Sequence, residues 1–107
     1  MATRRQQIQH FIYQRHTDPA PVKELAGYLS LCESRTIHLV KELFGCSYIK
    51  LVNEMRLRTA ASLLRNSSLP IVEVSLSSGF RDLSYFHRTF RRHFGSTPLQ
   101  YRLGAGV

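Results

Sequence analysis

The residues best suited to chemistry lie near the carboxyl end, in the stretch GFRDLSYFHRTFRRHFGSTPLQYR from residue 79 to 102. At about 100° per residue, Ser84, Arg88 and Arg91 share one arc of a helix, with His87 at its edge. A guanidinium group presents a planar fork of N–H donors that fits the paired oxygens of a phosphate or the O6 and N7 acceptors of guanine. The chemistry predicted for this arc is therefore recognition of negative charge.

A second side of the same helix is hydrophobic. Phe86, Phe90 and Phe94 recur at every fourth position, which places their rings in a ridge along one face. Aromatic rings can also stack on nucleic-acid bases, but this spacing is typical of a buried helix face, so the ridge is interpreted as core. A helix from Asp82 to Phe94 is thus expected to bury its aromatic side and expose its arginine side.

The charge of the whole chain agrees with a polyanionic partner. Among 107 residues, 15 Lys and Arg face 7 Asp and Glu, which gives a net charge of +8. Such an imbalance favours nucleic acid or an anionic membrane surface as the partner, although a basic surface that only solubilises the protein is an alternative. The hydrophobic fraction of 43% and the length predict a single folded domain.

Several classes of protein are disfavoured by what the sequence lacks. Cys32 and Cys46 are too far apart for a C-x-x-C motif and too few for a zinc site or a disulfide framework. There is no Gly-rich phosphate loop, no clustered pair of carboxylates and no nucleophile motif, so neither an enzyme nor a cofactor is expected. Metal ligation by His38 or His87 is not expected either.

The amino-terminal segment MATRRQQIQHF has no apolar core of a signal peptide, and no run of 18 apolar residues occurs in the sequence. We therefore expect a soluble, cytoplasmic protein without a membrane partner.

Hydrophobic periodicity, caps and breakers divide the chain into seven expected helices. They cover residues 2–16, 22–29, 33–44, 48–66, 70–76, 82–94 and 98–102. Because no segment alternates with the period of a strand, the expected fold class is all-α. The helix over 48–66 lacks Gly and Pro and would span about 27 Å, which makes it the longest element. The tail from Gly104 to Val107 is expected to fray.

Individual residues mark the helix ends. Gly45 is a suitable C-cap because glycine adopts the left-handed conformation easily. Ser47, Asp82 and Thr97 are suitable N-caps, and Pro70 is expected at the first position of a helix.

An internal repeat suggests how the helices are organised. Glu24-Leu25-Ala26 aligns with Glu73-Val74-Ser75, and Phe44-Gly45-Cys46-Ser47 aligns with Phe94-Gly95-Ser96-Thr97. The outer arcs also agree: Ser34, Ile37, His38 and Lys41 align with Ser84, His87, Arg88 and Arg91. Two unrelated helical hairpins are the alternative, but agreement in one register favours a repeat. We expect two helix-turn-helix subdomains, about 5–46 and about 67–103, joined by a linker helix over about 47–66 within one DNA-binding domain, 1–107.

This arrangement resembles the DNA-binding domain of the AraC/XylS family of bacterial transcription regulators. The motifs that carry the resemblance are Arg56-Leu57-x-x-Ala60-x-x-Leu63-Leu64 and the longer signature from Gly79 to Arg102. The resemblance covers roughly residues 5 to 103. It implies a seven-helix domain in which each of two helix-turn-helix subdomains inserts a recognition helix into the DNA major groove.

Carried over onto this sequence, the resemblance implies two sets of base-contacting residues. They would be Ser34, Ile37 and His38 in the first recognition helix, and Leu83, Ser84, His87 and Arg88 in the second. Arg91 and Arg92 would lie near phosphates, and the charge of Lys41 suits the same role. On physical grounds Arg88 is the best candidate for a bidentate guanine contact. Ile37 and Leu83 could meet thymine methyl groups or could be edge-of-core residues.

The first subdomain departs from the family pattern. Ser30 stands where glycine is usual, Cys32 where a capping serine is usual, and His38 where arginine is common. Thr36 and Val40 are smaller than the usual Leu and Phe. The fold is expected to survive these changes, while the contacts of the first recognition helix would differ from the pattern.

The partner expected first is double-stranded DNA, read by a monomer in two successive groove segments about 34 Å apart. A surface for RNA polymerase is a second expected interaction. Members of this family usually carry a separate ligand or dimerisation domain, for which these residues leave no room. The chain is therefore expected to be either an excised carboxyl-terminal domain or a small single-domain member. In the first case a dimer could form through a domain outside these residues.

Overall fold

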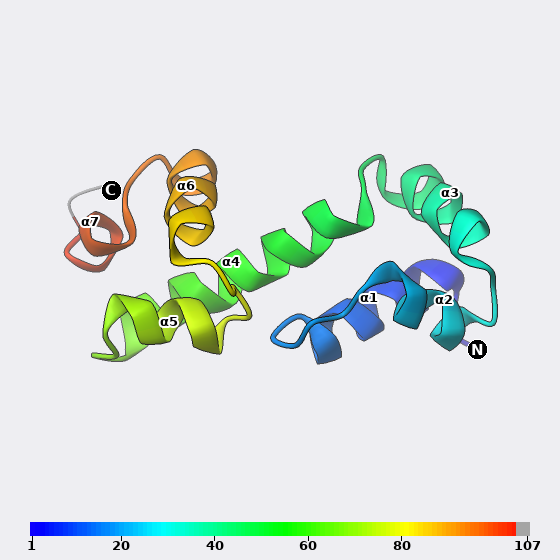
Figure 1. Cartoon of the computed structure of the whole chain (residues 1–107), viewed down its shortest axis with the longest axis horizontal. Helices are drawn as coiled ribbons and strands as arrows, with labels where there is room; N and C mark the ends of the chain where they lie inside the picture. The colour runs from blue at the N-terminus through cyan, green and yellow to red at the C-terminus, as the bar shows by residue number, and fades with distance from the viewer. Residues whose placement is uncertain (105–107) are drawn as a thin grey trace. The chain divides into compact units, whose positions relative to one another are not determined.

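The computed structural model describes residues 1–104, and within that range it contains helices and turns but no strand (Figure 1). The helices are α1 (Arg4–Arg15), α2 (Val22–Leu29), α3 (Glu33–Phe44), α4 (Tyr48–Asn66), α5 (Ile71–Ser77), α6 (Leu83–Phe94) and α7 (Pro98–Arg102). The all-α class and the seven expected helices are thereby confirmed. Of the tail expected to fray, Gly104 forms a turn in which its amide donates to the Tyr101 carbonyl at 3.1 Å, and residues 105–107 lie outside the described range.

Most helix ends carry the expected caps. The Asp82 carboxylate accepts a hydrogen bond from the Tyr85 amide at 3.0 Å, and Thr97 forms a capping box with Gln100. α1 begins two residues later than expected because Thr3 and Gln6 form another capping box, which was not predicted.

The expectation for Pro70 was wrong by one residue. Pro70 has an extended backbone, with ψ at 150°, and stands as the N-cap before α5. Its missing N–H suits either position, since the first amides of a helix have no intrahelical partner.

The chain divides into two compact units, residues 1–55 and 56–107, and each has its own core. The core of the first unit is formed by α1, α2, α3 and the start of α4, with Ile8, Leu25, Val40 and Val52 almost inaccessible to solvent.

The core of the second unit is formed by the rest of α4 with α5, α6 and the turn between the last two. Phe86 and Phe90 are fully buried, with ring centroids 5.7 Å apart, and the half-buried Phe94 lies 4.5 Å from Phe90. Tyr101 of α7 meets Phe90 edge-on at 5.4 Å. The aromatic ridge is therefore core, as predicted.

The turns between α2 and α3 and between α5 and α6 share one backbone pattern. The amide of Leu31 donates to Ala26 at 2.9 Å, and its counterpart Phe80 donates to Ser75 at 3.0 Å. Both turns pass through a left-handed residue at the same place, Ser30 with φ at 58° and Gly79 with φ at 106°. The local geometry of the helix-turn-helix thus occurs once in each unit.

Candidate nucleic-acid interface

The outer face of α6 is exposed because the opposite face packs into the core of the second unit. Phe86 and Phe90 point into the core of the second unit, so residues between them at helical spacing face outward. The helix starts at the Asp82 cap and ends at Gly95, which has φ at 79°. The exposed face of α6 can therefore contain only residues between these two caps.

The residues predicted on this face are all exposed: Leu83, Ser84, His87, Arg88, Arg91 and Arg92. Leu83 retains 41% of its accessible surface, which removes it from the core and leaves it available for an apolar contact.

The Arg88 guanidinium lies over the ring of Tyr85, 6.0 Å from its centroid. Tyr85 had no predicted role. The signal that could have revealed it is an aromatic residue three positions before an arginine on one helix face. Such a contact restricts the motion of the long Arg88 side chain while its N–H groups stay exposed.

α3 has the same construction in the first unit. Thr36 and Val40 are fully buried at the positions equivalent to Phe86 and Phe90, and Gly45 ends the helix with φ at 72°. The N-cap is weaker because sulfur is a weak hydrogen-bond acceptor, and here the Cys32 sulfur accepts from the Arg35 amide at 3.5 Å. The predicted contact residues Ser34, Ile37, His38 and Lys41 are all exposed.

His38 is held in a defined orientation on this face. Its Nδ1 lies 2.9 Å from the backbone carbonyl oxygen of Ser34, one turn earlier in α3. The ring of His87 in α6 instead makes an edge-on contact with the ring of Phe86, at 5.7 Å between centroids. His38 and His87 therefore differ in how their rings are fixed.

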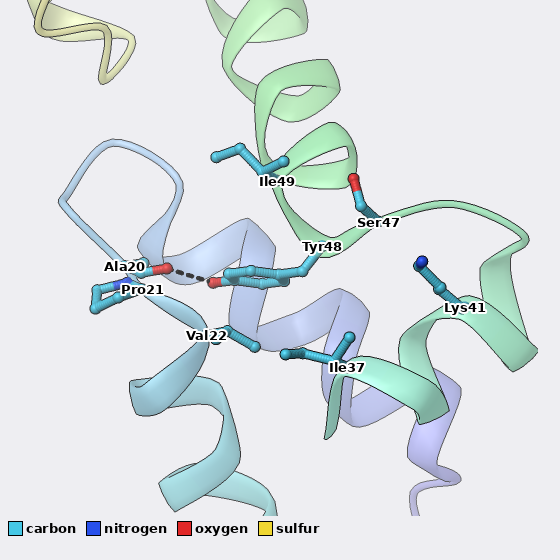
Figure 2. A pocket seen from close by; sticks show the side chains of 8 residues that line it. All are labelled: Ala20, Pro21, Val22, Ile37, Lys41, Ser47, Tyr48 and Ile49. Carbon is cyan, nitrogen blue, oxygen red and sulfur yellow. Dashed lines mark hydrogen bonds between the residues drawn. The ribbon is translucent and has the colours of Figure 1, made fainter. Parts of the chain in front are cut away.

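A depression of about 440 Å³ lies beside α3 in the first unit (Figure 2). Its wall includes Ile37 and Lys41 from α3, together with Val22, Tyr48 and Ile49. The Tyr48 hydroxyl donates to the Ala20 carbonyl at 2.7 Å at one side of it. Ile37 is 43% exposed while lining this depression, so it lies at the edge of the core and is also accessible from outside.

Other arginines hold the fold together. Arg4 donates to the carbonyl of Leu29 at 3.0 Å, Arg5 donates to the carbonyl of Leu43, and Arg102 donates to the carbonyl of Leu64 at 3.2 Å. These carbonyls belong to the last turns of α2, α3 and α4, where backbone oxygens have no intrahelical partner. Arg102 therefore caps α4.

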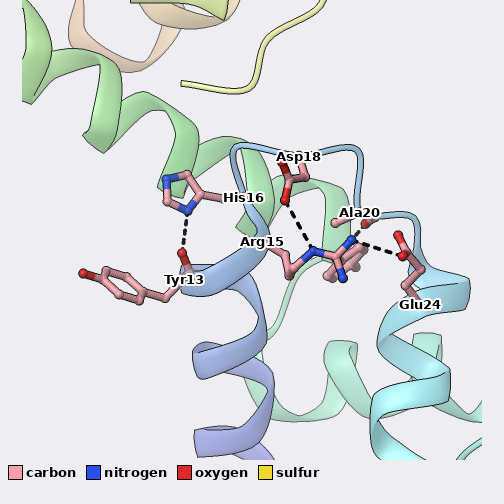
Figure 3. A network of polar contacts seen from close by, with 7 residues as sticks. Tyr13, Arg15, His16, Asp18, Ala20 and Glu24 are labelled. Atoms are coloured by element: carbon pink, nitrogen blue, oxygen red, sulfur yellow. Dashed lines mark hydrogen bonds and ion pairs between the residues drawn. The ribbon is translucent and has the colours of Figure 1, made fainter. Parts of the chain in front are cut away.

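Arg15 lies in a polar network between α1 and α2 (Figure 3). Its Nη2 is 3.1 Å from Glu24 Oε1 and its Nε is 3.6 Å from Asp18 Oδ2. The hydrogen bond that Arg15 donates to the Glu24 carboxylate, together with the negative charge of that carboxylate, raises the pKa of Arg15 above the usual value. The guanidinium also lies over the Phe11 ring, 5.6 Å from its centroid. Arg4, Arg5 and Arg15 of α1 thus all bind residues of neighbouring helices.

Neither a membrane span nor a metal site occurs in the part of the chain that the structure describes. No helix there is both long and apolar enough to cross a bilayer, and no three His, Cys, Asp or Glu side chains gather to hold a metal ion.

Residues 25–104 match the family described as helix-turn-helix domain. A curated relative, the arabinose operon regulatory protein of Salmonella typhimurium, is 32% identical over 99 residues, which are 92% of this chain and 34% of that protein. The chain spans about a third or less of the length of the curated relatives it matches.

Two solved structures have a similar fold. A transcriptional regulator of Chromobacterium violaceum, described as containing an AraC-type DNA-binding domain, is 28% identical with a TM-score of 0.84, over 91% of this chain and 87% of that one. The DNA-binding domain of AdpA, solved in complex with a target DNA, has the same TM-score of 0.84 at 24% identity, over 91% and 87% of the two chains. At 24% identity, the likeness to the AdpA domain shows a similar fold and nothing more.

Proposed function

This chain belongs to the AraC/XylS family of helix-turn-helix domains, and from that premise we propose that it binds double-stranded DNA sequence-specifically and regulates transcription. The observation that carries the proposal is α6, a helix in which Phe86 and Phe90 are fully buried while the opposite face exposes Ser84, His87, Arg88 and Arg91. Such a helix can enter the major groove, whose width admits one α-helix.

The proposed contacts divide by chemistry. Lys41, Arg91 and Arg92 neutralise phosphates, which supplies affinity and orients the helices without reading sequence. Base edges are read by Ser34, Ile37 and His38 from α3, and by Leu83, Ser84, His87 and Arg88 from α6. In this set Arg88 reads guanine through two parallel hydrogen bonds, and the two apolar side chains meet thymine methyl groups.

We propose further that α3 and α6 occupy successive major-groove segments of one duplex. The length of α4 supports this, since 19 residues span about 28 Å and two such segments lie about 34 Å apart. The domain then consists of subdomains over about 5–46 and about 67–103 with a linker helix over about 47–66. In this proposal the segment binds as a monomer in the bacterial cytoplasm, and any dimer forms through another domain.

RNA polymerase is the proposed second partner. The exposed side of α5 and the loop before it carries Leu69, Val72 and Leu76, of which Leu76 retains 52% of its surface. The residues of the first unit equivalent to Val72 and Leu76 are Lys23 and Gly27. Because the repeated fold does not require apolar residues there, a protein contact is a reasonable use for them.

A salt titration of binding to duplex DNA tests the proposed function. If three side chains displace counterions from phosphates, log Kobs falls with log salt concentration at a slope of roughly −2.7, about −0.9 for each contact. Replacement of Lys41, Arg91 and Arg92 by methionine should flatten that slope. A wild-type affinity that does not change with salt would overturn the proposal and favour a protein-only partner.

A further inference from the structure

We infer that His38 recognises a base with an exocyclic amino group in the major groove, adenine or cytosine, whereas its counterpart Arg88 recognises guanine. The inference rests on the proposed DNA binding and extends it to the chemistry of the target at one position.

The two residues occupy the same place on two copies of one helix. α3 and α6 both have 12 residues, both end at a left-handed glycine, and His38 and Arg88 are each the sixth residue. The inward neighbours also correspond, since Val40 and Phe90 are both fully buried two residues later. The backbone positions correspond, so the chemical difference between them lies in the side chains.

The hydrogen bond to Ser34 determines the tautomer of His38. A carbonyl oxygen only accepts hydrogen bonds, so Nδ1 at 2.9 Å from it must carry the proton. In the neutral ring, Nε2 then has a free lone pair and acts as an acceptor. The side chain is exposed, and Nε2 makes no hydrogen bond to another side chain or backbone group in residues 1–104.

An acceptor and a donor select different bases in the major groove. Adenine and cytosine offer an amino group there, at N6 and N4, whereas guanine and thymine offer carbonyl oxygens, O6 and O4. The Nε2 lone pair of His38 can bind the amino group and is repelled by the carbonyl oxygen. Arg88 carries only donors and is steadied over Tyr85, so it binds the O6 and N7 acceptors of guanine.

The inference is tested by selecting bound sequences from a random duplex pool with the wild type and with variants, and then measuring affinities on single-base variants of the selected site. Wild type should prefer adenine or cytosine over guanine or thymine at one strand position, by about two- to ten-fold, as expected for one hydrogen bond. His38→Ala should abolish the preference at that position alone. His38→Arg should change it to guanine.

Two further variants isolate the role of the lone pair. His38→Glu, whose carboxylate only accepts hydrogen bonds, should keep the preference for an amino base while weakening binding overall. Arg88→His is the reciprocal control, and it should abolish the guanine preference at a different position of the same site. Thermal unfolding of every variant should match wild type, since both residues are exposed.

The outcomes separate this inference from the proposed function. If wild type selects no sequence, the proposed function fails. If wild type selects a sequence but no position responds to His38 substitutions, or the responding position prefers guanine or thymine, the inference alone is overturned.

Discussion

Arginine side chains in this protein differ in what their guanidinium groups touch. Arg4, Arg5 and Arg102 donate to backbone carbonyls in the last turns of other helices, where a cation also complements the negative end of the helix dipole. Arg88 and Arg91 lie on the exposed face of α6. Positive charge alone therefore does not identify a DNA contact in this chain.

The first prediction concerns the two exposed arginines. Arg88→Ala should relax the preference at one base pair and cost about 1–3 kcal/mol on the preferred sequence, because a bidentate guanine contact is lost. Arg91→Ala should weaken binding to all sequences alike, since a phosphate carries no sequence information. Competition binding with matched and mismatched duplexes measures both effects. Equal binding of every duplex by both variants and wild type would refute the assignment of α6.

The second prediction compares an exposed arginine with a capping one. Arg91→Met should reduce the slope of log Kobs against log salt by about 0.9, the effect of one phosphate contact. Arg102→Met should leave the slope unchanged, because its guanidinium is engaged with Leu64 of α4. A salt titration of the two variants checks this, and a reduced slope for Arg102→Met would place that residue on the DNA.

At the level of the secondary-structure elements, the two helix-turn-helix copies differ in how well their turns suit the residues in them. Ser30 adopts φ of 58° where the second copy has Gly79. A side chain in the left-handed region costs about 1–2 kcal/mol relative to the right-handed one, and glycine avoids that cost. The Cys32 cap is also longer than the Asp82 cap. The first helix-turn-helix therefore has the same backbone as the second, with a less favourable residue in its turn and a weaker N-cap.

The third prediction follows from the Ser30 backbone. Ser30→Gly should stabilise the protein by about 0.5–1 kcal/mol, because relief of strain exceeds the entropy that glycine adds to the unfolded chain. Denaturant unfolding measures the change. The matched control is Gly79→Ser, which should destabilise the second unit, since φ of 106° is unfavourable for a residue with Cβ. A lower stability for Ser30→Gly would contradict the reasoning.

On the scale of the whole molecule, each unit has a separate core and its own candidate recognition helix. α4 supplies Val52 to the first core and Leu57 to the second, so one continuous helix takes part in both. If one chain binds two successive groove segments, as we propose, its DNA site must contain two half-sites at a fixed spacing.

The fourth prediction concerns the spacing of the DNA site. The selected sequence should contain two half-sites with centres about 10 base pairs apart, one turn of the duplex. Insertion of about 5 base pairs between them should weaken binding strongly, because it rotates one half-site to the opposite side of the DNA. Insertion of the same length outside the site is the control. Tolerance of the internal insertion would show that the two helices bind independently.

Much of the fold could be predicted without coordinates, because the signals involved are local. Residues such as Gly45, Asp82 and Thr97 act on amides or carbonyls within one turn, and the four-residue spacing of Phe86, Phe90 and Phe94 defines a buried face from sequence alone. The same periodicity put every predicted contact residue on an exposed face, although contact with DNA stays a prediction.

The roles of individual polar side chains could be identified only from the folded chain. Arg4 reaches a carbonyl 25 residues away and Arg102 one 38 residues away, and no local pattern distinguishes them from Arg91. Which ring nitrogen of His38 is available to a partner likewise depends on the hydrogen bond between its Nδ1 and the Ser34 carbonyl. The ends of a helix are determined by residues close in sequence, so the sequence alone predicts them. The partner of a long arginine side chain depends on which helices pack together, so only the tertiary structure decides it.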